Sequence, residues 1–166
     1  MGASGPGLHG NAERVQQALT AAGSSARVLE LAASTRTSAE AAAALDVDVG
    51  QIAKSLVFLA DGRPVVVVAS GADRIDTAAL SRELDGRRIG RADAEAVRAG
   101  TGYPIGGVSP AGLPPALPVL IDQALAQYHL IYAAAGTPHA VFATTYDELL
   151  RLTGGRPVDV RIAPAG

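Results

Sequence analysis

The chain has 166 residues, of which 48% are hydrophobic, and a formal net charge of −2 at pH 7, so it is long enough for one domain with a proper core. It contains no cysteine, which excludes disulfides, thiolate metal sites and a cysteine nucleophile. The slight negative charge argues against a protein that coats a nucleic-acid backbone, although it suits one that grips only a nucleic-acid terminus.

The beginning of the chain predicts a short tail and no targeting segment. Residues 1–8 are rich in glycine and are expected to be disordered, which leaves a single domain over residues 9–166. The start lacks the basic and apolar regions of a signal peptide, and no apolar run approaches the ~20 residues that cross a bilayer. We therefore expect a cytoplasmic protein without a membrane partner.

Periodicity and capping signals predict helices and strands in the first half of the chain. Asn11 is a candidate N-cap, Thr37 opens a capping box, and Asp61-Gly62 is typical of a hairpin turn. The predicted elements are a helix over 11–22, a strand over 27–31, a short helix ending at 45, and paired strands over 51–59 and 65–69.

The second half continues this alternation, and no repeat or linker divides it. The predicted elements are helices that begin after the caps Asp76, Asp93 and Thr145, strands over 87–90, 119–121 and 158–162, and a hairpin over 130–135 and 140–143. We therefore predict an α+β fold in one domain, with a mostly antiparallel, mixed sheet that curls toward a barrel and is flanked by helices.

Lys54 is the only lysine in the chain, and the other thirteen basic residues are arginines. It lies in an apolar strand and shares a strand face with Ile52, Leu56 and Phe58, because side chains alternate along a strand. A partly desolvated ammonium needs an anion, a carbonyl or a cavity as its partner. Two interpretations stay open: a site lysine that reaches into a pocket, and a lysine near a strand end that extends its ammonium to water.

A glycine-rich loop over residues 106–110 is the second candidate site. Successive N–H groups in this loop could converge on one point, which suits an oxyanion or a phosphate. The alternative is a rigid turn that only links two elements. Ser109 has no evident base in the sequence, so a hydrogen-bonding role is favoured over a nucleophilic one, and Tyr103 suits packing as well as substrate contact.

The segment Gly136-Thr137-Pro138-His139 is the third candidate. His139 could orient a substrate or a water molecule, but the segment also suits a simple hairpin tip. The histidines at 9, 129 and 139 make no metal-binding spacing, and no P-loop, HExxH motif or Rossmann fingerprint is present. We therefore expect neither a metal nor a cofactor.

The order of these segments carries a resemblance. Ile-Ala-Lys-Ser-Leu at 52–56 is followed by Gly-Tyr-x-x-Gly-Gly-Val-Ser-Pro at 102–110 and by Ala-Ala-Gly at 134–136. This arrangement resembles the YbaK/ProX-type aminoacyl-tRNA deacylases, the family that includes the editing domain inserted in bacterial prolyl-tRNA synthetases. The resemblance covers residues 15–162, and the lysine strand with the glycine loop is its more specific part.

The resemblance implies a site. In that family the strand lysine is the residue most tied to activity, and Lys54 matches it. The family's loop glycines and proline match Gly102, Gly106, Gly107 and Pro110, and its later glycine matches Gly136. The segment 140–143 is apolar where relatives often carry charges, so the specificity can differ. The expected catalytic residues are Lys54, Gly106, Gly107, Val108 and Ser109, and the expected substrate-binding residues are Tyr103, Pro110, Gly136 and His139.

The resemblance also implies a function. We expect a free-standing trans-editing deacylase that hydrolyses the ester of a mischarged tRNA, Cys- or Ala-tRNA(Pro). Its partners would be the tRNA 3′ acceptor end and prolyl-tRNA synthetase. Such hydrolysis needs a positioned carbonyl, stabilisation of the developing negative charge and a nearby nucleophile. Two alternatives are a non-catalytic module that binds aminoacyl-tRNA or a synthetase, and a lysine enzyme that forms a Schiff base with a small carbonyl compound.

Overall fold

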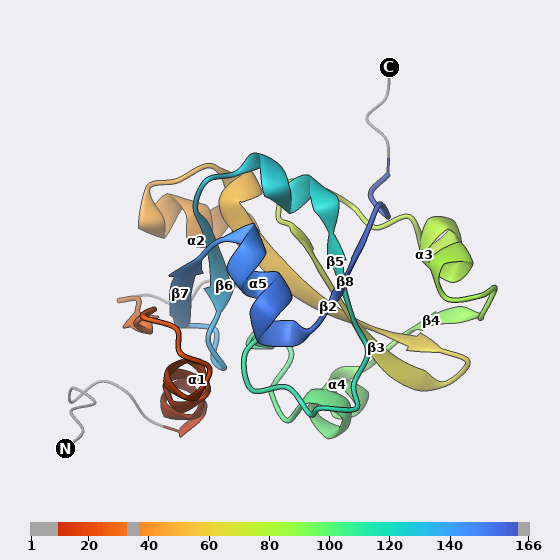
Figure 1. Cartoon of the computed structure of the whole chain (residues 1–166), viewed down its shortest axis with the longest axis horizontal. Coiled ribbons are helices and arrows are strands. Elements are labelled where there is room, and N and C mark those ends of the chain that lie inside the picture. The colour runs from red at the N-terminus through yellow and green to blue at the C-terminus, as the bar shows by residue number, and fades with distance from the viewer. Residues whose placement is uncertain (1–9, 33–36, 163–166) are drawn as a thin grey trace.

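The computed structural model describes residues 10–32 and 37–162, which contain five α-helices and one eight-stranded sheet (Figure 1). The tail expected over 1–8 lies outside these residues. The helices are α1 Gly10–Ala21, α2 Ser38–Leu45, α3 Thr77–Glu83, α4 Ala94–Thr101 and α5 Tyr146–Thr153, with 3-10 turns η1 Val49–Gln51 and η2 Gln123–Gln127. The strands are β1 Leu29–Glu30, β2 Ile52–Ala60, β3 Arg63–Ser70, β4 Ile89–Arg91, β5 Val119–Asp122, β6 Ile131–Ala134, β7 Ala140–Thr144 and β8 Arg156–Val158.

The sheet is mixed, as predicted, and β2 is at its centre. Its strand order is β1-β7-β6-β2-β3-β5-β8, and β4 pairs with β2 beside this path. The hairpin β2–β3 turns through Asp61 and Gly62, whose φ angles of 50° and 81° are those of a two-residue hairpin turn. The pairs β2–β6, β3–β5 and β5–β8 are parallel, so the sheet is not purely antiparallel.

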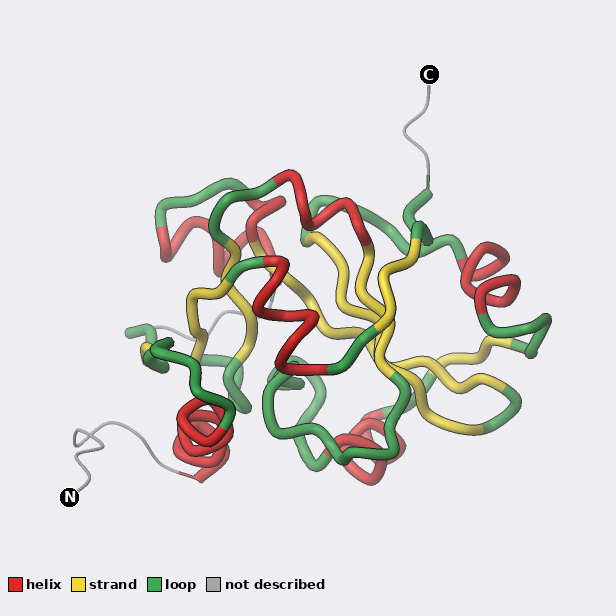
Figure 2. Tube along the Cα trace, viewed as in Figure 1, coloured by secondary structure: helices red, strands yellow, loops and turns green. Residues whose placement is uncertain are grey.

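Helices cover both faces of the sheet (Figure 2). Alternate residues of β3 face opposite cores: Val66 and Val68 join the larger core with α1, α4 and α5, whereas Val67 joins Leu80 of α3 in the smaller one. A third cluster packs α2 against the start of β2. The run 65–69 is completely buried because helices lie on both faces of β3, which confirms its expected position.

The predicted helix caps are confirmed with one exception. Thr37, Asp76, Asp93 and Thr145 each accept a backbone hydrogen bond from the first turn of their helix. Asn11 is not an N-cap, because α1 already begins at residue 10 and the Asn11 amide donates to a distant carbonyl instead.

The last strand begins earlier than predicted. Gly154, with a φ of 64°, ends α5, and the chain enters the sheet almost at once as Arg156–Val158, which pairs with β5. Beyond this strand the Asp122 carboxylate accepts the N–H of Val160, and only Arg161 forms an isolated bridge, to Ile75. The prediction of a strand over 158–162 was therefore wrong in its position, although the alternation of buried residues that suggested it is real. No helix within the described residues is long and apolar enough to cross a membrane.

Candidate functional site

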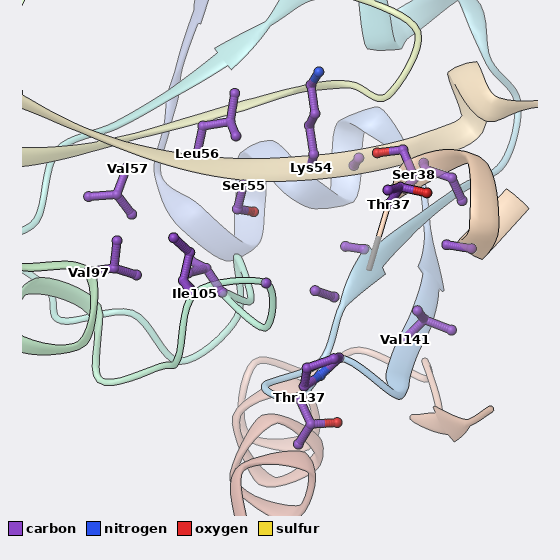
Figure 3. A pocket seen from close by; sticks show the side chains of 18 of the residues that line it. Thr37, Ser38, Lys54, Ser55, Leu56, Val57, Val97, Ile105, Thr137 and Val141 are labelled. Atoms are coloured by element: carbon purple, nitrogen blue, oxygen red, sulfur yellow. The ribbon is translucent and has the colours of Figure 1, made fainter. Parts of the chain in front are cut away.

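A pocket of about 470 Å³ lies along one edge of β2 (Figure 3). Its walls come from segments that are far apart in the sequence. They come from β2 itself, the start of α2, the segment from β4 to α4, the loop 105–108, β6, and the segment that enters β7. Outside β2, α2 and β6 the lining residues are Arg91, Ala92, Val97, Ile105, Gly106, Val108, Thr137, Pro138, Ala140 and Val141. Most of the lining residues are aliphatic, and a small polar set lines the pocket with them: Thr37, Ser38, Lys54, Ser55, Arg91 and Thr137.

The pocket exists because β2 is unpaired at the middle of one edge. Its other edge pairs with β3 along the whole strand, from Ala53 to Ala60. On the pocket edge, β6 pairs with residues 52 and 53, and β4 pairs with residues 58 to 60. The structure therefore assigns no partner strand to residues 54–57 on this edge within the described part of the chain.

The hydrogen-bonding direction of β2 can be read from its register. The N–H of Gly71 donates to the carbonyl of Ile52, so even-numbered residues of β2 direct their backbone groups toward β3. Odd-numbered residues point to the opposite edge, as the bond from the N–H of Asp61 to Arg88 confirms. The N–H and C=O groups of Ser55 and Val57 therefore point into the unpaired edge.

Lys54 lines the pocket with a partly buried side chain. Its Nζ donates to the backbone carbonyl of Asp73 at 2.5 Å. Burial lowers the pKa of this amine from its ordinary value of 10.5, the Asp73 carboxylate acts in the opposite direction, and the Arg74 guanidinium lowers the pKa further. Lys54 is thus neither fully buried nor free in water, and it holds its proton less tightly than an ordinary lysine.

The Lys54 side chain leaves β2 on the side away from Ile105 of the glycine loop. Figure 3 shows Lys54 and Leu56 on one side of β2, and Ser55 and Val57 on the other side, toward Ile105. The cause is the alternation of side chains along the strand. In this conformation the Lys54 amine lies on one side of β2, and Ile105 of the glycine loop lies on the other side.

Ser55 is a site residue that our sequence reasoning missed. Its Oγ is buried and has no hydrogen-bond partner among the described residues, and its side chain points into the pocket (Figure 3). A buried hydroxyl without a partner is costly, so such a group is a candidate for ligand contact. The available signal was a hydroxyl in an apolar strand on the face opposite Lys54.

The glycine loop contributes only part of its length to the pocket. Gly106 and Val108 line it, together with Ile105, which is 59% exposed. Gly107 does not; it packs against the other loop so closely that an added Cβ would lie 2.9 Å from backbone atoms of Gly136. Its N–H donates to the carbonyl of Pro104 within the loop, so this amide is already satisfied.

The remaining residues of this loop stand behind the pocket wall. Ser109 is fully buried, and its Oγ accepts the N–H of Ala111, which is a local structural bond. Pro110 is buried beside it. Neither residue lines the pocket, so a role for them in substrate contact stays a prediction without geometric support.

Tyr103 lies in the core and closes the base of the loop. Its hydroxyl donates to the carbonyl of Ala111 at 2.6 Å, and burial raises its pKa. Arg14 of α1 lies over the Tyr103 ring at 4.7 Å and donates to the carbonyls of Gly102 and Gly112 at 3.3 and 3.2 Å. Arg14 and Tyr103 thus tie together the two ends of the segment that carries residues 105–108.

The second loop is also attached to α1. The Asn11 amide donates to the carbonyl of Gly136 at 3.2 Å, and Gly136 has a φ of 92° that favours glycine. Thr137 and Pro138 line the pocket, whereas His139 is exposed and does not line it. Of the predicted segment 136–139, only the two middle residues, Thr137 and Pro138, line the pocket.

The described residues contain no group of three or more His, Asp or Glu side chains that could hold a metal ion. The chemistry available at the pocket is that of an amine, the guanidinium of Arg91, side-chain hydroxyls that include the unbonded one of Ser55, and free backbone groups. With aliphatic walls from Val57, Val97 and Ile105, this set suits a small acyl group whose carbonyl must be hydrogen-bonded.

Comparisons with known proteins agree on one family. Residues 32–152 match the family described as the aminoacyl-tRNA editing domain. YwhH of Bacillus subtilis (strain 168), an uncharacterized protein, is 33% identical over 123 residues, which are 74% of this chain and 78% of YwhH. EbsC of Enterococcus faecalis, named as a candidate Cys-tRNA(Pro)/Cys-tRNA(Cys) deacylase, is 29% identical over 125 residues, with 74% and 76% of the two chains covered.

Larger proteins and solved structures extend this result. A proline–tRNA ligase of Latilactobacillus sakei is 32% identical over 101 residues, which cover 61% of this chain and only 17% of the ligase. A crystal structure named as a candidate trans-editing enzyme for prolyl-tRNA synthetase superposes with a TM-score of 0.88 and 43% identity, covering 94% of this chain and 99% of the other. The sequence match and the shared fold lead to one conclusion, which the resemblance had predicted: this chain belongs to the aminoacyl-tRNA editing domain family.

Proposed function

We propose that the protein hydrolyses, in trans, the ester bond of a mischarged tRNA, with Cys- or Ala-tRNA(Pro) as the substrate. The observation that carries this proposal is the pocket at the unpaired edge of β2, which Lys54 and the unbonded hydroxyl of Ser55 line from opposite sides of the strand, together with free backbone groups and aliphatic side chains. Membership of the editing family supports it, as do the names of EbsC and of the trans-editing structure.

The reaction requires little chemistry from the protein. Water adds to the ester carbonyl, the bond from the carbonyl carbon to the ribose oxygen breaks, and the ribose oxygen takes a proton, which releases the amino acid and intact tRNA. If the thiol of a cysteinyl substrate attacked first, its sulfur would form a cyclic thioester with the carbonyl carbon as the bond to the ribose oxygen breaks, and water would open that ring afterwards. Attack by a ribose hydroxyl would only move the acyl group to that oxygen, from which water would still have to release it. The main task of the site is to position the carbonyl and stabilise its developing negative charge.

Lys54 has the role of an electrostatic anchor in this scheme. Its ammonium would bind the terminal ribose-phosphate or the carbonyl oxygen, since both carry or develop negative charge. Ser55 adds a hydrogen bond from the other side of β2, and Gly106 of the loop lies close to the pocket without a side chain that would fill it. The amide of Gly107 is bonded within the loop, so backbone donors for the oxyanion come more readily from β2.

The aliphatic residues that line the pocket would select the substrate amino acid by its size. Val57, Val97 and Ile105 leave room for a small side chain, and a site of this kind excludes a larger cognate amino acid by steric conflict. This arrangement suits removal of alanine or cysteine from a tRNA whose correct amino acid is the bulkier, cyclic proline.

The test is a deacylation assay with tRNA(Pro) charged with radiolabelled alanine, cysteine or proline. We expect release of alanine or cysteine, at least 100-fold slower in Lys54→Ala and in Lys54→Arg, because a planar guanidinium does not replace an ammonium in a fitted site. Arg27→Ala, which removes an exposed cation outside the pocket, is the matched control and should keep the wild-type rate.

Three outcomes would contradict the proposal or the role given to Lys54. Retarded electrophoretic migration of charged tRNA without release of the amino acid would indicate the binding module. Full activity of Lys54→Arg would remove this residue from the mechanism. Borohydride trapping of a carbonyl compound on Lys54 would indicate the Schiff-base alternative. The only feature of the structure that supports this alternative is the amine itself.

A further inference from the structure

The unpaired stretch of β2 is a backbone binding site of defined length. Four residues lie between the last pair with β6 and the first pair with β4, which is about 13 Å of strand. Only Ser55 and Val57 direct their N–H and C=O groups outward there. Both strands that flank the stretch are fixed by their own pairing, so the space between them cannot widen without breaking the sheet.

This length selects the kind of ligand. Recognition of a peptide as an added strand needs a longer free edge, because main-chain hydrogen bonds must recur along it. An edge with two outward residues accommodates about one residue of a strand. An aminoacyl ester is such a unit: it has an amine that donates and a carbonyl that accepts, in the same relation as the N–H and C=O of one amino-acid residue.

We propose that Ser55 and Val57 bind the aminoacyl group through their main-chain atoms, as if it were a one-residue strand between β6 and β4. A carbonyl oxygen of this pair accepts the α-amino group of the substrate, and an N–H of the pair donates to the ester carbonyl. The inference rests on the proposed function and adds to it: the site recognises a free α-amino group, and β2 itself supplies a donor to the oxyanion.

The position of the pocket supports this assignment. Ala133 and Ala134 of β6 and Arg91 of β4 line the two ends of the pocket, so the ligand lies between the two strands that leave the edge free. The unbonded Ser55 hydroxyl lies in the same stretch. Hydrogen bonds to the backbone of β2 do not depend on the side chain of the substrate amino acid. Discrimination between amino acids would therefore come from the residues that line the pocket.

The first test removes the amine from the substrate. Wild-type protein is given Ala-tRNA(Pro) and propionyl-tRNA(Pro), which has the same acyl skeleton without the α-amino group, and each rate is divided by the uncatalysed hydrolysis rate. We expect a loss of about tenfold or more in the corrected kcat/KM for the propionyl ester, since one hydrogen bond to the site is lost. Equal corrected values would overturn recognition of the amine.

The second test removes one backbone N–H at a time, by incorporating an α-hydroxy acid in place of Val57 or of Leu56. The Val57 N–H points into the pocket, so its replacement should lower kcat/KM about tenfold with an unchanged thermal midpoint. The Leu56 N–H points toward β3, so that control should lower the thermal midpoint instead. An unchanged kcat/KM in the Val57 variant would overturn the role of this N–H.

The tests separate the two proposals. If the protein hydrolyses Ala-tRNA(Pro) but treats both substrates and the Val57 variant alike, the function stands and the backbone site fails. If no aminoacyl-tRNA is hydrolysed, the proposed function fails and the backbone site fails with it.

Discussion

Ile105 is a candidate for a single residue that controls the selectivity of the proposed site. It lies on the loop at the pocket, on the side of β2 that Ser55 and Val57 face, and it is 59% exposed although it is a large aliphatic residue (Figure 3). Because it lines the pocket and contributes little to the core, Ile105 can be shortened to test its role in substrate selection with little effect on the fold.

The Ile105→Ala variant tests this role. We expect release of proline from Pro-tRNA(Pro) to rise about tenfold, because the removed methylene groups widen the pocket, while the thermal midpoint stays close to that of the wild type. Ile162→Ala is the matched control, since Ile162 is 50% exposed and does not line the pocket. Unchanged discrimination between alanine and proline would show that Ile105 is not part of the wall.

At the scale of elements, α1 organises both loops of the site although it does not line the pocket. Arg14 donates to the carbonyls of Gly102 and Gly112, and Asn11 donates to that of Gly136. One helix face therefore sets the distance between the loop 105–108 and the segment 136–139.

The Arg14→Lys variant should distinguish the hydrogen bonds that position the two loops from the effect of the positive charge of Arg14. A lysine keeps the positive charge but cannot bridge two carbonyls in the planar geometry of a guanidinium, so we expect kcat to fall about three- to tenfold. The effect on KM should be small if substrate contacts are retained. Arg27→Lys is the control, because Arg27 is exposed and does not line the pocket; an equal loss of kcat there would argue against the positioning role of Arg14.

Local signals predicted the elements well, and long-range pairing explains what they missed. Thr37, Asp76, Asp93 and Thr145 mark helix starts because a cap involves only neighbouring residues. Lys54 could be singled out by its residue type alone. The free edge beside it could not, because it depends on where β6 and β4 stop pairing with β2, and these strands come from distant parts of the sequence.

The glycine loop shows the same limit at the site. Its residue types predict converging amides, but the structure shows that Gly107 is committed to close packing with Gly136 and that its N–H bonds within the loop. Whether a glycine is present for its amide or for its missing side chain cannot be read from its position in a motif. The opposite orientations of Lys54 and Ser55, by contrast, follow from strand alternation once the strand is known.

At the scale of the whole molecule, the partly buried amine of Lys54 makes the free energy of unfolding depend on pH. The pKa of Lys54 is lowered in the folded chain, so between the folded value and 10.5 the unfolded chain binds more protons. The free energy of unfolding therefore rises with pH across this window, whereas the cost of holding the charged amine is fully present at lower pH.

Comparison with Lys54→Met isolates this contribution, because methionine is similar in length and cannot be protonated. We expect the difference in unfolding free energy, wild type minus variant, to shift in favour of the wild type as pH is raised toward 10.5. Denaturant unfolding of both proteins at several pH values measures it, and the ionisation of tyrosines cancels in the difference. A constant difference across this range would show that burial does not perturb the amine.

The presence of one lysine has a practical consequence. Apart from the chain terminus, reductive methylation with a ¹³C reagent would label a single side chain, Lys54. The methyl resonance of that amine would report directly on the site: its titration gives the pKa, and its chemical shift changes when a ligand displaces the Asp73 carbonyl. This protein therefore carries a built-in spectroscopic reporter whose signal has to be distinguished only from that of the chain terminus.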